Sequence, residues 1–75
     1  MTRLPRVSGE QAIRALERLG FMAVRQRGSH VILRKEIDTG AVGCAVPLHK
    51  ELALGTLRGL LKQAGVPHRD FLKSL

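Results

Sequence analysis

Residues 21–47 read FMAVRQRGSHVILRKEIDTGAVGCAVP, and they decide the fold because they predict three strands joined by two short connections. The segments rich in apolar and β-branched residues, which are typical of strands, are 21–26, 30–35 and 41–46. Residues 27–29 and 37–40 carry turn signals, and Pro47 ends the third strand because it has no N–H to donate. Connections this short exclude parallel crossovers, so we expect an antiparallel meander.

A helix is predicted immediately before this segment. Ser8 and Gln11 have the spacing of a capping box, in which a serine caps the first turn and the glutamine caps the serine. Apolar residues then recur with helical periodicity as far as Leu19. Gly20 is suited to the left-handed position that closes a helix. We therefore expect a helix over about residues 8–19.

Two more helices are predicted after the strands. Leucines at helical spacing indicate a helix over about residues 54–64, which Gly65 ends. Pro67 is expected at the first position of a short final helix, because its ring presets the helical φ angle. That helix should bring Phe71 and Leu72 to the core.

The predicted element order is α-β-β-β-α with a short C-terminal helix, in a single domain over residues 1–75. We expect an α+β fold in which two helices cover one face of a three-stranded antiparallel sheet and the other face is open. This order is that of folds like the double-stranded-RNA-binding domain. The start of the 54–64 helix, however, offers only Arg58 instead of the basic cluster needed to bind duplex RNA in that way.

The charge of the chain points to a polyanionic partner. Thirteen Lys and Arg residues against six Asp and Glu give a formal net charge of +7 on 75 residues. Residues 1–35 hold eight basic and two acidic side chains, whereas residues 36–75 hold five basic and four acidic ones. We therefore expect the anion-binding surface to be formed mainly by the first half.

Several classes are excluded or disfavoured by composition. Aromatic residues make up 3%, which argues against RNA binding on exposed aromatic platforms. No apolar run approaches the ~20 residues of a membrane span, and no apolar secretion signal is evident. Cys44 is the single cysteine and is expected to be a buried, inert thiol. These features predict a protein of the reducing cytoplasm with no membrane association.

His30 is the strongest candidate for chemistry. It follows Gly28 and Ser29 in the expected turn, and four cationic side chains lie within five residues of it: Arg25, Arg27, Arg34 and Lys35. A histidine transfers protons near neutral pH, and the cations could bind a phosphodiester and stabilise its transition state. This pattern suits metal-free RNA cleavage, in which the 2′-hydroxyl attacks the adjacent phosphate. Spacing alone favours the other interpretation, a partly exposed strand histidine beside a solvated charged face.

The other histidines carry weaker signals. His49, beside Lys50 in the loop after the third strand, is a candidate for RNA contact or for loop structure. His68 is expected to be structural or exposed to solvent. The three histidines are 19 residues apart and have no neighbouring ligands at metal-binding spacing, so we expect neither a metal site nor a cofactor.

The chain resembles the HicA family of bacterial type II toxins, also called YcfA-like proteins. Five short motifs in the matching order carry the resemblance, which runs from about Leu4 to Leu72: residues 4–9, 19–21, 27–30, 46–49 and 55–65. The resemblance implies an endoribonuclease that cleaves mRNA (an mRNA interferase) and a cognate HicB-type antitoxin. It implies that His30 of the Gly-Ser-His motif is the catalytic histidine, with Gly28 and Ser29 setting the turn before it.

Two functions therefore remain in competition. The first is a toxin of a type II toxin–antitoxin system that cleaves mRNA through His30. Either His30 makes both proton transfers in turn, or water or His49 supplies the second. The alternative is a non-catalytic module of the same fold that binds RNA or a partner protein. In either case we expect a monomer when free and a hetero-oligomer with an antitoxin that covers His30.

Overall fold

The computed structural model describes residues 3–75 as an α+β fold. Its elements in chain order are α1 (Gly9–Arg18), β1 (Met22–Arg27), β2 (His30–Ile37), β3 (Gly40–Pro47), α2 (Leu54–Ala64) and α3 (His68–Ser74). The three strands form one antiparallel sheet in the order β1-β2-β3. The predicted α-β-β-β-α order, the meander and the short C-terminal helix are all confirmed.

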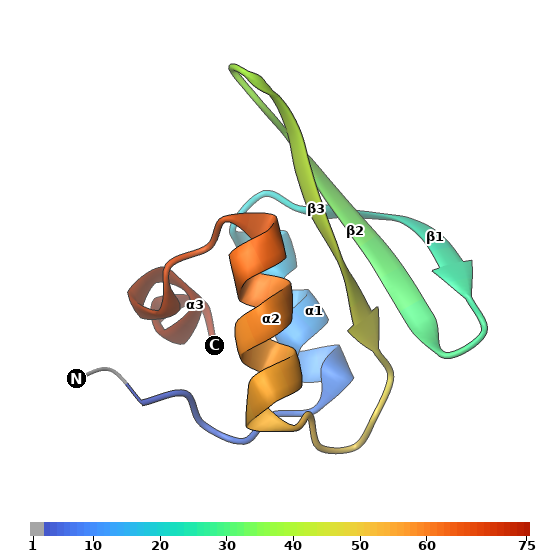
Figure 1. Cartoon of the computed structure of the whole chain (residues 1–75), viewed down its shortest axis with the longest axis vertical. Helices are drawn as coiled ribbons and strands as arrows, with labels where there is room; N and C mark the ends of the chain where they lie inside the picture. The colour runs from blue at the N-terminus through green and yellow to red at the C-terminus, as the bar shows by residue number, and fades with distance from the viewer. Residues whose placement is uncertain (1–2) are drawn as a thin grey trace.

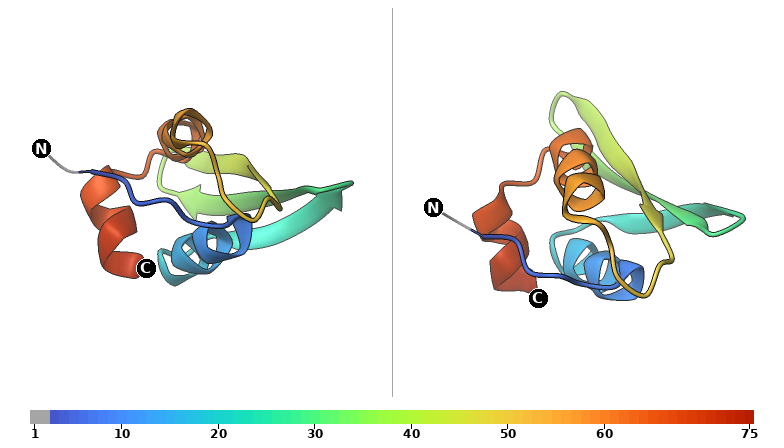
Figure 2. Two further views of the ribbon diagram at one scale, coloured as in Figure 1. Left: turned by 90° about the horizontal axis from the view of Figure 1, so that it is seen from below. Right: turned by 60° about the horizontal axis from the view of Figure 1, so that its bottom comes forward.

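Two helices and the sheet enclose the core. α1 and α2 lie against one face of the sheet, α3 packs beside α1, and the opposite face of the sheet is bare (Figures 1 and 2). The largest fully buried side chains come from the helices, the sheet and the loop before α2: Leu16, Leu33, Val46, Leu52, Leu57, Leu61 and Phe71. Burial of such side chains stabilises the fold by about 1.5–3 kcal/mol each. No helix within residues 3–75 is long and apolar enough to cross a membrane.

The helix ends confirm the capping predictions with one exception. The Ser8 hydroxyl accepts from the Gln11 N–H, and the Gln11 side chain accepts from the Ser8 N–H, which completes the capping box. Gly20 and Gly65 have φ angles of +99° and +69°, the left-handed region that favours glycine. The exception is Pro67, which was expected inside α3 but is its N-cap. Its ψ of 144° is extended, and its carbonyl accepts the first helical bond.

The strand boundaries differ slightly from the prediction. The ladder of β2 and β3 extends to the pair Ile37 and Gly40, so the turn between them consists of Asp38 and Thr39 alone. The turn was expected over four residues, 37–40, but only its two central residues form it. The outer two, Ile37 and Gly40, pair with each other as the last residues of the ladder. β1 begins one residue later than expected, since the buried Phe21 packs into the core before the strand starts.

Candidate active site

His30 lies exposed at the first position of β2, directly after a two-residue turn. Gly28 in that turn has a φ of +55°, which is unfavourable for residues with a side chain. The Gln26 side chain donates to the Gly28 carbonyl at 3.1 Å, and the Leu48 N–H donates to the Ser29 carbonyl at 2.7 Å. The turn is therefore bonded on both sides, and it fixes the backbone from which His30 projects.

The strand register brings cationic side chains to the same face as His30. His30 pairs with Arg27 of β1 on one side and with Pro47 of β3 on the other. Residues directly opposite in a sheet share a face, with Cβ atoms ~4.5–5.5 Å apart. Since the intervening residues of β2 are buried against the helices, this is the open face. Arg27 is thus the nearest cation across the sheet from His30.

The next two rows of the sheet continue this face. They consist of Arg25, Ile32 and Ala45, followed by Met22, Arg34 and Gly43. Of the cations in the three rows, Arg34 pairs with Glu36 at 3.1 Å. Within residues 3–75, no carboxylate lies within ion-pair distance of Arg25 or Arg27. Their charges are available to an anion at this face.

A β-bulge in β1 puts the two arginines on this face. The register shifts between Ala23 and Arg25, so Val24 is the additional residue. Simple alternation from Ala23, which pairs with the buried Leu33, would have directed Arg25 and Arg27 toward the helices. Sequence reasoning missed the bulge. The signal was two arginines at alternate positions that a regular strand would have forced toward the core.

Lys35 is an expected site residue that the structure does not bring to this face. Its Nζ donates to the Leu19 carbonyl at the end of α1 at 2.7 Å, and it lies 5.7 Å from the centroid of the Phe21 ring. A cation at a helix C-terminus stabilises the unpaired carbonyls there. Lys35 therefore holds α1 to the sheet on the helix-covered side.

His49 and Lys50 lie in the loop after β3, at the same end of the sheet as His30. With Ser8 they line a separate shallow hollow, and the His49 carbonyl accepts from the Gly9 N–H at 2.9 Å. A Cβ on Gly9 would collide with the Pro47 carbonyl oxygen. This close approach of backbones holds the loop against the start of α1, two residues beyond the strand partner of His30.

Other catalytic groups find little support in the structure. Cys44 is buried, as predicted, and burial raises the pKa of its thiol to about 11, so it stays protonated near neutral pH. Over the described part of the chain, no cluster of three or more His, Cys, Asp or Glu side chains could hold a metal ion. His68 begins α3, which packs beside α1 rather than against the sheet.

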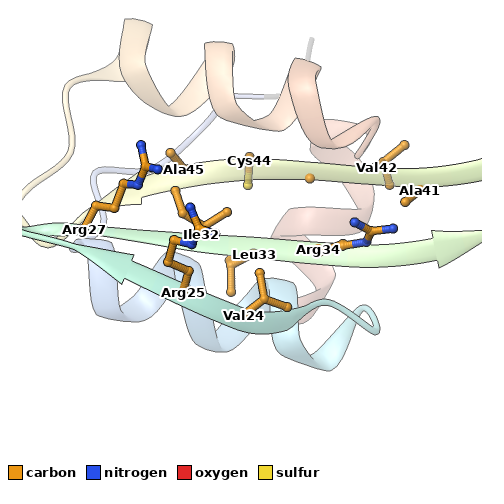
Figure 3. Close-up of a pocket in the computed structure, with 11 residues that line it drawn as sticks. Val24, Arg25, Arg27, Ile32, Leu33, Arg34, Ala41, Val42, Cys44 and Ala45 are labelled. Carbon is orange, nitrogen blue, oxygen red and sulfur yellow. The ribbon is translucent and has the colours of Figure 1, made fainter.

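Residues of all three strands line an open groove on this face, and His30 is not among them. Its volume is about 630 Å³, and its lining includes Arg25, Arg27, Ile32 and Arg34. Figure 3 shows Arg25 and Arg27 near Ile32 and Ala45 at one end, with Arg34 farther along β2 toward Val42 and Ala41. His30 thus lies at the edge of a cationic surface with a partly apolar floor.

Most of the chain matches one protein-family model. The model described as the HicA toxin of bacterial toxin–antitoxin systems matches residues 9–66, which include the whole sheet and the first two helices. The chain belongs to the HicA toxin family. The comparison with curated proteins found no significant match. Membership of this family supports a toxin role and, in general terms, an antitoxin partner.

Proposed function

We propose that this HicA-family toxin is a metal-independent endoribonuclease that cleaves mRNA in the cytoplasm, with His30 as its catalytic histidine. The observation that carries the proposal is the row that joins the exposed His30 to Arg27, with Arg25 and Arg34 on the same open face. A proton-transfer group beside unpaired guanidinium groups is what cleavage of a phosphodiester requires.

In the proposed reaction, His30 takes the proton of a ribose 2′-hydroxyl. The 2′-oxygen then bonds to the adjacent phosphorus, and the bond from phosphorus to the 5′-oxygen breaks. The products are a 2′,3′-cyclic phosphate and a 5′-hydroxyl, whose oxygen must receive a proton. Water or His49 supplies that proton, and Arg27 stabilises the additional negative charge on the phosphorane.

Replacement of His30 tests the mechanism. We expect His30→Ala to lower the rate of RNA cleavage about 100-fold or more, because general acid–base catalysis contributes about 10²–10⁴-fold. Cleavage is measured in EDTA, and the fragments are tested for 2′,3′-cyclic phosphate ends. His68→Ala is the matched control, since it removes a histidine from α3 without touching the sheet.

The outcomes separate the two competing functions. If His30→Ala cuts RNA as fast as the wild-type protein, the proposed mechanism is wrong. If the wild-type protein binds RNA with steep salt dependence but releases no fragments, the chain is a binding module of the same fold.

We also propose that a HicB-type antitoxin neutralises the protein by covering His30 and the arginines of the open face. A free toxin of this kind is expected to be a monomer, and the neutralised one a hetero-oligomer. An acidic partner surface with some apolar contacts suits the charge and the partly apolar floor of this face. Formation of the complex should abolish cleavage, and an inhibitory partner bound to α2 and α3 instead would contradict this.

A further inference from the structure

The groove on the open face has no role in the proton transfers proposed for His30. It is a wide depression of about 630 Å³ that is open to solvent rather than an enclosed pocket. The floor consists of Ile32 and of small residues on β3, which are Ala41, Gly43 and Ala45. Their short side chains allow a ligand to approach the backbone of the sheet.

Guanidinium groups border this apolar floor at both ends. Arg25 and Arg27 lie near Ile32 at the end closer to His30, and Arg34 lies at the other end (Figure 3). Arg34 is engaged by Glu36, whereas Arg25 and Arg27 have no acidic partner among residues 3–75. The groove therefore suits a ligand with flat apolar faces whose neighbouring groups are anionic.

An unpaired nucleotide has this chemistry. Arginine guanidinium planes stack on RNA bases as aromatic rings do. Neither phenylalanine can take that role, because Phe21 and Phe71 are only 5% and 0% exposed. Stacking in the groove would thus depend on Arg25 or Arg27 on one side of the base and on Ile32 on the other.

The groove is also the right distance from His30. Two residues along a strand span ~7 Å, so the row of Ile32 is one such step from the row of His30. A phosphate at His30 and Arg27 therefore leaves the adjoining nucleotide over Ile32 and Ala45. A base in a duplex could not enter, because its edges are paired and its faces stacked.

We infer that this groove is a subsite for one unpaired base next to the phosphate cleaved at His30, which confines the substrate to single-stranded RNA. This inference rests on the proposed function. An RNA occupant is favoured over a protein segment because the unpaired cations adjoin both the groove and the proposed reacting phosphate.

Filling the groove tests the inference. Ala45→Leu adds bulk at the end of the groove closer to His30 without changing the charge. We expect it to raise KM for a short single-stranded RNA about tenfold, because the added bulk displaces one stacked base. Thr39→Leu, at the exposed turn between β2 and β3, is the matched control and should leave KM unchanged. Circular dichroism and thermal unfolding check that both variants fold.

RNA oligonucleotides with single abasic positions identify the base that occupies the groove. One position adjoining the cleaved bond should weaken binding to the wild-type protein about tenfold. The same abasic position should have little further effect in Ala45→Leu, because both changes remove one interaction. Binding is followed by fluorescence anisotropy on RNA with a 2′-deoxy nucleotide at the cleaved position, which lacks the attacking hydroxyl and so stays intact. Annealing the oligonucleotide to its complement should abolish cleavage.

Two results would overturn the inference. One is an abasic scan with no position whose effect is lost in Ala45→Leu. The other is an Ala45→Leu variant that binds and cuts RNA normally but escapes neutralisation by the antitoxin, which would assign the groove to the partner protein. Either result leaves the proposed function intact if His30→Ala still abolishes cleavage, so the two failures are distinguishable.

Discussion

The two faces of β2 have opposite roles although their residues alternate along one short strand. His30, Ile32 and Arg34 belong to the open face, whereas the residues between them face the helices. The contrast is sharpest at Arg34 and Lys35, which are adjacent cations with different partners. Arg34 is exposed to solvent beside Glu36, while Lys35 bonds the end of α1. Face, rather than charge or proximity to His30 in the sequence, decides which cation lies beside His30 on the open face.

The largest expected effect is a difference in the free energy of unfolding between substitutions of two adjacent aliphatic residues that lie on opposite faces of β2. Leu33 is 0% exposed, so Leu33→Ala should lower the free energy of unfolding by about 2–5 kcal/mol through lost burial and a cavity. Ile32→Ala on the open face should cost about 1 kcal/mol or less. Urea unfolding of both variants measures the difference. Equal losses would show that the open face is part of the core.

A smaller effect concerns the pH dependence of stability through Cys44, on the helix-covered face. Its pKa is raised from 9.0 to about 11 by burial, so the unfolded chain loses this proton at a lower pH than the folded one. Stability from this thiol is therefore present below pH 9 and lost as the pH rises toward 11. At pH 10 the loss should be about 1 kcal/mol.

Cys44→Ala provides the comparison for that measurement. Wild-type and variant proteins are unfolded in urea at pH 7 and at pH 10, and the difference between them should shrink at the higher pH. A difference that stays constant would mean that the thiol is not shielded from water by α2 and the sheet.

The smallest expected effects on stability concern the adjacent cations Arg34 and Lys35, each replaced by an uncharged residue. Lys35→Met should lower the free energy of unfolding by about 1 kcal/mol, because it removes a charged donor from the end of α1. Arg34→Ala should change stability by less than about 0.5 kcal/mol, since its pair with Glu36 is exposed.

RNA binding should show the reverse order for the same two variants. Arg34→Ala should reduce the slope of log K against log salt by about one, as the loss of one phosphate contact does. Lys35→Met should leave the slope nearly unchanged. A larger change in slope for Lys35→Met would mean that RNA contacts the helix-covered side of the sheet, and it would contradict the proposed binding on the open face.

Much of the fold was predictable because local signals agree with one another. Ser8 and Gln11 marked the start of α1, glycines marked the ends of two helices, and short connections required an antiparallel sheet. The burial of Cys44 and the exposed position of His30 after a tight turn were also predictable. Each of these depends on a few neighbouring residues and on backbone geometry.

Which residues form the candidate site was less predictable. Proximity in the sequence grouped Lys35 with Arg34, but a strand sends adjacent residues to opposite faces. Sequence proximity also could not show that Arg25 and Arg27 share the face of His30, because that depends on the bulge at Val24. The groove was invisible for the same reason, since residues of all three strands form it.

The sequence by itself determined the element order, the capping box of α1, the glycines that end α1 and α2, the strongly basic first half and the single histidine at the head of a strand. These follow from periodicity, capping chemistry and composition, which act over a few residues. Only the tertiary structure decided which cations accompany His30 and that an apolar groove adjoins it. Those depend on strand register, where a shift of one residue transfers every later side chain to the other face.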